Sequence, residues 1–151
     1  NAIESIAFQD EVVNGVFLNI QKDESSILNG VIIKISLEEL KVLKLREKNY
    51  SCITIRKDEI VDNIIDSDLI AFMTTNEEKI AKIGDKNSFI PAKYIEIVKN
   101  ALENYDENFK KDFEPTFQDY PFPLKEGIYN FTDPIQNKAA REGNKNCNES
   151  N

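Results

Sequence analysis

The chain has 151 residues, of which 40% are hydrophobic, enough for one globular domain with a real core. Its 27 acidic residues against 19 basic ones give a formal charge of −8, which disfavours nucleic acid and anionic membranes as partners. The chain has no histidine, which excludes Ser-His-Asp and Cys-His catalysis, imidazole metal ligation and histidine pH switching.

The remaining side chains limit the chemistry further. Cys52 and Cys147 form neither a disulfide framework nor a paired metal-ligand motif, and we expect no metal or other cofactor. Acid-base chemistry near neutral pH then falls to a carboxyl group with a raised pKa, a lysine with a lowered pKa, a tyrosine or a thiol. No stretch approaches the roughly 18 apolar residues of a membrane span, and no secretory pattern opens the chain, so we expect a cytoplasmic protein.

Two early segments have the composition of strands. Residues 12–21 (VVNGVFLNIQ) and 27–35 (ILNGVIIKI) are rich in β-branched side chains and flank a short polar connection. This arrangement predicts that they pair as a hairpin. Gly15 and Gly30 lie inside the runs, where a glycine often marks a bulge or a close backbone approach.

The next segment predicts a helix over residues 36–47 (SLEELKVLKLRE), because its leucines recur at helical spacing. Ser36 followed by Glu39 is the pattern of a capping box, which satisfies amide donors in the first turn. Its start is therefore the best-defined boundary in the chain.

Residues 50–55 (YSCITI) and 68–75 (DLIAFMTT) alternate and are rich in β-branched residues, which predicts two further strands. Residues 56–67 between them fit either a hairpin loop or an interruption.

The second half predicts helices. Pro91 stands where a helix can begin, and residues 92–105 place apolar side chains near one face. A shorter helix through residues 107–117 is expected to stop before Pro115, since the residue preceding a proline is driven out of helical geometry.

The amino-acid composition changes after Phe117, which predicts a domain boundary there. We expect one domain over residues 1–117 and a C-terminal extension over residues 118–151. Aromatic residues in the first part of the extension suit packing against the domain, whereas the polar residues from 135 onward predict a loose chain.

Glu47 ends the first predicted helix, and two readings of it remain open. Many surface carboxylates look the same, and Arg46 and Lys48 would relieve the repulsion from the negative end of the helix. If the side chain instead turns inward, desolvation and the helix end would both raise its pKa, which suits a group that alternates between base and acid.

The order of these segments resembles the gamma-glutamylcyclotransferase-like family. The stretch LKLREKNYSCITI (43–55) is similar to the family's Leu-Asp-x-x-Glu segment followed by a tyrosine. AFMTTN (71–76) is similar to its Ser-Tyr-Leu-Met-Thr strand, and FIPAKYIEIVKNAL (89–102) is similar to its Pro-Ser-x-x-Tyr segment and helix. The resemblance covers roughly residues 10–117.

This resemblance implies an α+β fold with a small mixed β-barrel and helices packed around it. It also implies release of pyroglutamate (5-oxoproline) and an amine or amino acid from a small γ-glutamyl amide, a cyclisation of acyltransferase or lyase type. Glu47 matches the family's general acid-base residue. Tyr50 and Tyr94 match tyrosines that line the substrate pocket, although each also suits simple packing.

The chain departs from the family in several places. Lys44, Phe72 and Ala92 replace the usual aspartate, tyrosine and serine. The family's first strand and its Tyr-Gly-Ser loop, which binds substrate through backbone amides, have no counterpart here, so we expect either that the chain begins inside a longer polypeptide or that the loop has been lost.

The sequence leaves other questions open. The leaving amine, the oligomeric state (monomer or homodimer) and activity itself are undetermined. The alternatives to an enzyme are a non-catalytic binding module for a small molecule or protein on the same fold, and a plain interaction domain that uses the acidic surface.

Overall fold

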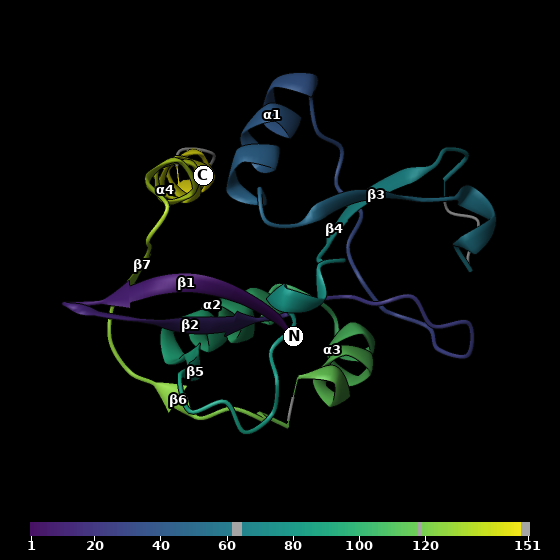
Figure 1. The fold of residues 1–151 in the computed structure, drawn as a ribbon. Helices are drawn as coiled ribbons and strands as arrows, with labels where there is room; N and C mark the ends of the chain where they lie inside the picture. Colours follow the sequence, from purple (N-terminus) through teal and green to yellow (C-terminus); the bar gives the residue numbers. More distant parts are fainter. Residues whose placement is uncertain (62–64, 118, 149–151) are drawn as a thin grey trace.

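A five-stranded mixed sheet and four α-helices make up the α+β fold in the computed structural model, which describes residues 1–61, 65–117 and 119–148 (Figure 1). The strands follow the order β6-β5-β2-β1-β7. β1 is antiparallel to β2 and β7, whereas β2 is parallel to β5 and β5 to β6. The strands are β1 (Ala2–Phe8), β2 (Glu11–Phe17), β5 (Ser88–Pro91), β6 (Leu124–Lys125) and β7 (Tyr129–Phe131).

A separate antiparallel ribbon contains β3 (Ser51–Ile55) and β4 (Leu69–Met73). It confirms the two strands predicted over residues 50–55 and 68–75. Part of the connection between them, residues 62–64, lies outside the described residues. Within the described chain the strands form this ribbon and the open sheet, so the expected closed barrel is not found.

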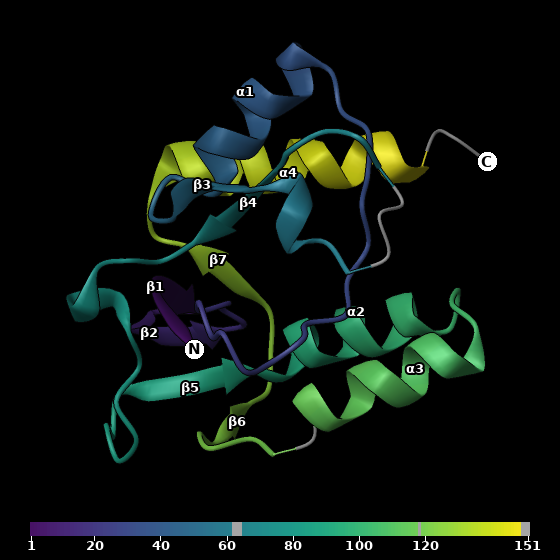
Figure 2. The same ribbon diagram turned by 90° about the vertical axis from the view of Figure 1, so that its right-hand side faces the viewer.

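The helices lie on two sides of the β1–β2 hairpin (Figures 1 and 2). α1 and α4 contact each other on one side, and α2 and α3 lie on the other side with β5 and β6. The helices are α1 (Leu37–Arg46), α2 (Ala92–Leu102), α3 (Glu107–Phe113) and α4 (Pro134–Asn148), with short 3-10 turns η1 (Lys57–Glu59), η2 (Glu77–Lys79) and η3 (Glu114–Thr116). No helix among the described residues has both the length and the apolar character needed to cross a bilayer.

The predicted starts of α1 and α2 and the predicted stop of α3 before Pro115 are confirmed, whereas α2 ends at Leu102, short of the predicted residue 105. At the start of α1, the Ser36 hydroxyl accepts from the Glu39 N–H at 3.2 Å, and the Glu39 carboxylate accepts from the Ser36 N–H at 2.6 Å. This reciprocal pair is the expected capping box. α2 follows Pro91 directly, and α3 ends at Phe113, before Pro115.

The first hairpin differs from the prediction. The predicted strand over residues 12–21 corresponds to β2, but its partner is β1, joined by a tight turn in which Gln9 has a φ of 52°. Residues 27–35 belong to no strand and lie largely exposed. The predicted pairing of the two segments was therefore wrong, because β1 and β5 occupy both edges of β2.

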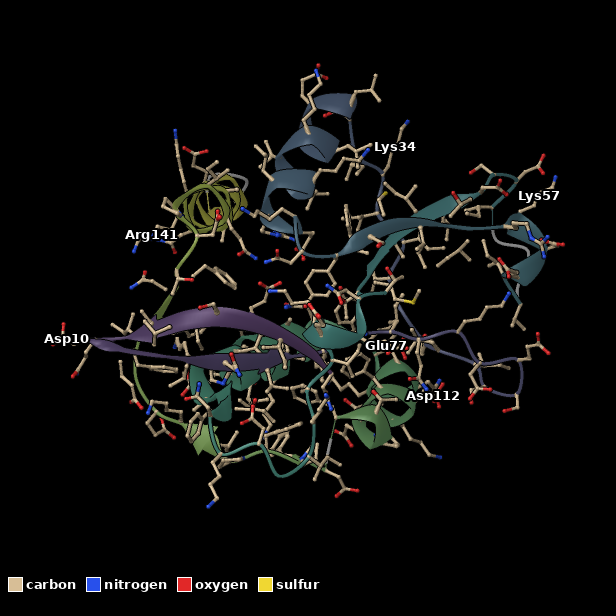
Figure 3. The ribbon with its side chains drawn as sticks, viewed as in Figure 1. Asp10, Lys34, Lys57, Glu77, Asp112 and Arg141 are labelled. Carbon is tan, nitrogen blue, oxygen red and sulfur yellow. The ribbon has the colours of Figure 1, made fainter. Side chains whose placement is uncertain are left out.

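The C-terminal residues contribute to the same sheet. β7 pairs with β1, and a loose chain was expected from residue 135 onward, where the structure has α4 (Pro134–Asn148) instead. Arg141 of α4 points towards β7, where its guanidinium donates to the Asn130 side chain at 2.5 Å (Figure 3). The division at residue 117 stays a prediction, although segments on both sides of it share one sheet.

Two buried apolar clusters hold the sheet and helices together. The first contains Val16, Ile90, Ile95, Phe117 and Phe122, and the second contains Ile6, Phe8, Val13 and Phe17. Burying one such side chain stabilises a fold by about 1.5–3 kcal/mol. Tyr94, at the start of α2, packs against both clusters, so its position is fixed by the core.

Candidate functional site

Glu47 lies where α1 ends and the chain turns towards β3. It is the C-cap residue, and its N–H donates to the Leu43 carbonyl at 2.7 Å. The side chain is 25% exposed, and its Oε1 accepts from Arg46 Nε at 2.8 Å. Arg46 therefore offsets the repulsion between this carboxylate and the negative end of the helix, as the sequence allowed.

Tyr50 completes the turn after Glu47, and its N–H donates to the Glu47 carbonyl at 2.9 Å. Burial raises the pKa of the Tyr50 hydroxyl well above its ordinary value, and the charges of Glu4 and Glu47 raise it further. The phenol is consequently neutral at physiological pH and is suited to donate a hydrogen bond, not to act as a base.

Tyr94 approaches from α2, far away in the sequence. Its ring meets Phe17 edge to face, with the centroids 5.1 Å apart, and its hydroxyl accepts from the Leu18 N–H at 3.3 Å. Burial raises the pKa of Tyr94 to about 12, with a smaller contribution from Glu47. The structure thus brings the three predicted site residues close enough for Glu47 to act electrostatically on both tyrosines.

Glu4, on β1, is a member of this site that the sequence analysis missed. Its side chain is only 2% exposed, and its Oε2 accepts from Asn49 Nδ2 at 2.5 Å. Its other oxygen, Oε1, is buried without a hydrogen-bond partner among the described residues. Burial raises the pKa of the Glu4 carboxyl; Asn49, Gln136 and Lys79 oppose the shift, and the Glu47 charge adds to it.

Helix α4 closes the site from the C-terminal side. The Asp133 carboxylate accepts from the Gln136 N–H at 2.9 Å and also forms an ion pair with Lys48. The backbone bond from Gln136 and the pairing with Lys48 lower the pKa of Asp133. This carboxylate therefore fastens the turn after α1 to the start of α4 and holds the buried Gln136 beside Glu4.

We refer to this group of side chains as the Glu4–Glu47 cluster: Glu4, Glu47, Asn49, Tyr50, Tyr94 and Gln136. Its two carboxyls and two neutral phenols suit proton transfer and the binding of a cationic hydrogen-bond donor. No group of three or more His, Cys, Asp or Glu side chains within the described ranges is arranged to hold a metal ion.

The charged tips of the fold lie away from this cluster. Asp10 lies at the tip of the β1–β2 hairpin, and Lys57 lies at the far end of the β3–β4 ribbon (Figure 3). Both point outward into solvent, as expected for hydrated surface charges, and neither contributes to the cluster.

A small open hollow, with a cavity volume of about 40 Å³, adjoins the cluster at Tyr94. Phe17, Leu18 and Tyr94 line it on one side. Neither Glu47 nor Tyr50 is among the described residues that line it. This volume is far below the roughly 300–1,000 Å³ of small-molecule sites, so the hollow has room for no more than a small group of a ligand. Tyr94 belongs to both the hollow and the cluster.

A signal for Glu4 was present in the sequence. Ala2, Glu4, Ile6 and Phe8 alternate along β1, so all four point to the same face of the sheet. A glutamate in step with buried apolar residues is unusual and marks a buried carboxyl. The contacts of Asn49 and Gln136 had no such signal, since they depend on the packing of α4.

Comparison with protein-family models, with curated proteins and with solved structures gave no match. The resemblance to the gamma-glutamylcyclotransferase-like family therefore rests on the quoted motifs alone.

Proposed function

We propose that this chain is a gamma-glutamylcyclotransferase-like enzyme that releases pyroglutamate and an amine from a small γ-glutamyl amide, with Glu47 as the acid-base group. The observation that supports the proposal most is that Glu47 and Tyr50 share one turn, with the Tyr50 N–H donating to the Glu47 carbonyl at 2.9 Å, and that Tyr94 comes from α2 to within electrostatic range of Glu47. These are the three residues that the motif resemblance singles out.

The reaction needs little beyond one carboxyl and a well-oriented substrate. The α-amine of the γ-glutamyl group attacks its own γ-carbonyl carbon, so that a ring C–N bond forms and the original amide C–N bond breaks. Glu47 takes a proton from the α-ammonium and returns it to the departing nitrogen. Ring closure is intramolecular and gains the high effective molarity of such reactions, provided that the substrate is held in a reactive conformation.

The two tyrosines bind and orient. Because their pKa values are raised, both hydroxyls keep their protons at neutral pH and can donate to a carbonyl or carboxylate. The Tyr94 oxygen already accepts from Leu18, which leaves its own proton free to donate towards a ligand in the neighbouring hollow.

The arrangement of the site residues supports the proposed activity, whereas the barrel that the resemblance implies does not. The described strands form an open sheet and a separate ribbon, and this arrangement still supplies the convergence of side chains. As part of the same proposal, the enzyme acts in the cytoplasm on a γ-glutamyl compound of the kind found in glutathione metabolism.

The test is pyroglutamate release from a panel of γ-glutamyl dipeptides, glutathione and γ-glutamyl amines, measured by mass spectrometry with the full-length gene product. Glu47→Gln is expected to lower the rate at least about 100-fold, the usual contribution of a positioned acid-base group. Glu38→Gln, which changes an exposed carboxylate on the same helix, is the matched control and keeps the rate. Full activity in Glu47→Gln would remove this residue as the catalyst.

One observation favours the alternative of a binding module without turnover. Arg46 Nε already donates to Glu47 Oε1 at 2.8 Å, so this oxygen is occupied. In that case the whole panel yields no pyroglutamate, while γ-glutamyl ligands still bind and protect the chain against thermal unfolding.

A further inference from the structure

Only one of the two oxygens of the Glu4 carboxyl has a hydrogen-bond partner among the described residues. Asn49 bonds Oε2, while Oε1 is closed off from solvent and makes no hydrogen bond with the described residues. The Gln136 side chain lies near enough to lower the pKa of the carboxyl, but it does not complete a hydrogen bond to Oε1. Leaving a buried carboxyl oxygen unpaired costs free energy, so such atoms are rare in folded proteins and call for an explanation. A ligand that supplies the missing donor would recover that cost.

The charges around Glu4 indicate what kind of donor fits. Arg46 is engaged with Glu47, and Lys48 is engaged with Asp133. None of the ion pairs between described residues includes Glu4, and the charge of Lys79 acts on the Glu4 carboxyl without forming an ion pair with it. Glu4 thus lacks an ion-pair partner and also feels the negative charge of Glu47, a combination that favours a positively charged group beside it.

We propose that Glu4 binds, through Oε1, the α-ammonium group of the γ-glutamyl substrate. This inference rests on the proposed function, because it names the substrate group that Glu4 would receive. An ammonium carries three donors and pairs with a carboxylate through charge-assisted hydrogen bonds, which are about twice as strong as neutral ones.

The binding mode has a consequence for the chemistry. An ammonium held by Glu4 lies on the side of the cluster that faces Glu47, the carboxyl that would take its proton. Glu47 is partly exposed and Oε1 is buried, so the proposal requires the ligand to enter past Glu47 and the turn over residues 47–50 to open for the ammonium. Glu4 thereby fixes which nitrogen reaches the base.

A matched pair of ligands tests the assignment. γ-Glutamylalanine carries the α-ammonium, and glutarylalanine has a hydrogen in its place with the rest of the molecule unchanged. Both are titrated calorimetrically into Glu47→Gln, which prevents turnover, and into the double variant Glu4→Gln/Glu47→Gln. Gln keeps the shape of Glu4 and its bond from Asn49 but removes the charge. Glu24→Gln in the Glu47→Gln background, at an exposed position, is the control.

Glu47→Gln is expected to bind γ-glutamylalanine about 10- to 100-fold more tightly than glutarylalanine, the contribution of a hydrogen bond to a charged group. The double variant loses this preference, and the Glu24 control keeps it. An unchanged preference in the double variant, or binding of neither ligand, would overturn the assignment.

A second readout needs no change at Glu4. In Glu47→Gln, the side-chain amide signals of Asn49 are expected to shift in NMR spectra with γ-glutamylalanine and not with glutarylalanine, because Asn49 shares the carboxyl that the ammonium approaches. Equal shifts with both ligands count against the proposal. Pyroglutamate release by the unaltered chain reports separately on the proposed function, so active enzyme without ammonium preference refutes Glu4 alone.

Discussion

Two segments of this chain share the sequence Asn-Gly-Val and lie in opposite environments. Residues 14–16 belong to β2, where Val16 is 1% exposed, whereas residues 29–31 lie outside any strand, and Val31 is 50% exposed. A side chain built on Gly15 would meet Ile6 at 2.5 Å, while nothing lies within 4 Å of the corresponding position on Gly30.

The difference shows that partners decide what a β-rich sequence becomes. β2 has a ladder on each side, with β1 along one edge and β5 along the other. The segment over residues 27–35 has the same β-branched composition and no ladder among the described residues. Strand propensity expresses packing against neighbours more than an intrinsic preference of the backbone, so it stays unrealised where those neighbours are missing.

The largest expected effect comes from truncating one isoleucine in each region. Ile6, fully buried on β1, contacts the apolar cluster beside β2, whereas Ile33 is 69% exposed. We expect Ile6→Ala to lower the free energy of unfolding by about 2–5 kcal/mol, from lost burial and the cavity left behind. Ile33→Ala should change it by less than about 0.5 kcal/mol. Urea denaturation measures both, and equal losses would mean that residues 27–35 are packed in solution.

A smaller effect is expected from the two glycines themselves. Gly15→Ala forces its new methyl group against Ile6 and Phe17, which are both buried, and overpacking of this kind costs about 1–3 kcal/mol. Gly30→Ala meets no neighbour, so its effect should stay within about 0.5 kcal/mol. The two midpoints in urea give the comparison directly. A neutral Gly15→Ala would show that the chain does not approach closely at this point of the hairpin.

The parts of the fold that local chemistry dictates were predictable from the sequence. The capping box at Ser36, the helix after Pro91 and the strands of the ribbon each depend on neighbouring residues, and each was confirmed. The partner of β2 depended instead on a competition between residues 2–8 and 27–35, which periodicity does not decide. Helix α4 was hidden by its polar composition, since its stability comes from packing along α1 and β7.

The candidate site likewise has residues that the sequence predicted and one that only the structure revealed. The sequence motif pointed to Glu47, Tyr50 and Tyr94, and the structure places all three around one cluster. Glu4 was missed because residues 2–8 were not recognised as a strand, so the inward register of its side chain went unseen. Burial and hydrogen bonding across the fold, which a linear pattern does not contain, decide its role.

Glu4 lies directly opposite Gly15 in the β1–β2 hairpin. Of the substitutions considered, Glu4→Gln is expected to change the stability least, because glutamine keeps the volume of the glutamate side chain. Burial raises the pKa of Glu4 above its value in the unfolded chain, so the fold favours the neutral carboxyl. The stability that this preference contributes is full below the unfolded pKa and is lost as the pH rises through the folded pKa. Glutamine does not titrate.

The melting temperature of Glu4→Gln relative to the unaltered chain should therefore differ little at pH 4 and rise progressively towards pH 8, as measured by thermal unfolding. Glu24→Gln, at an exposed position, should show no comparable rise. A constant difference at Glu4 across this range would mean that its carboxyl is hydrated in the folded chain. Glu4 would then not count among the buried residues of the β1–β2 hairpin.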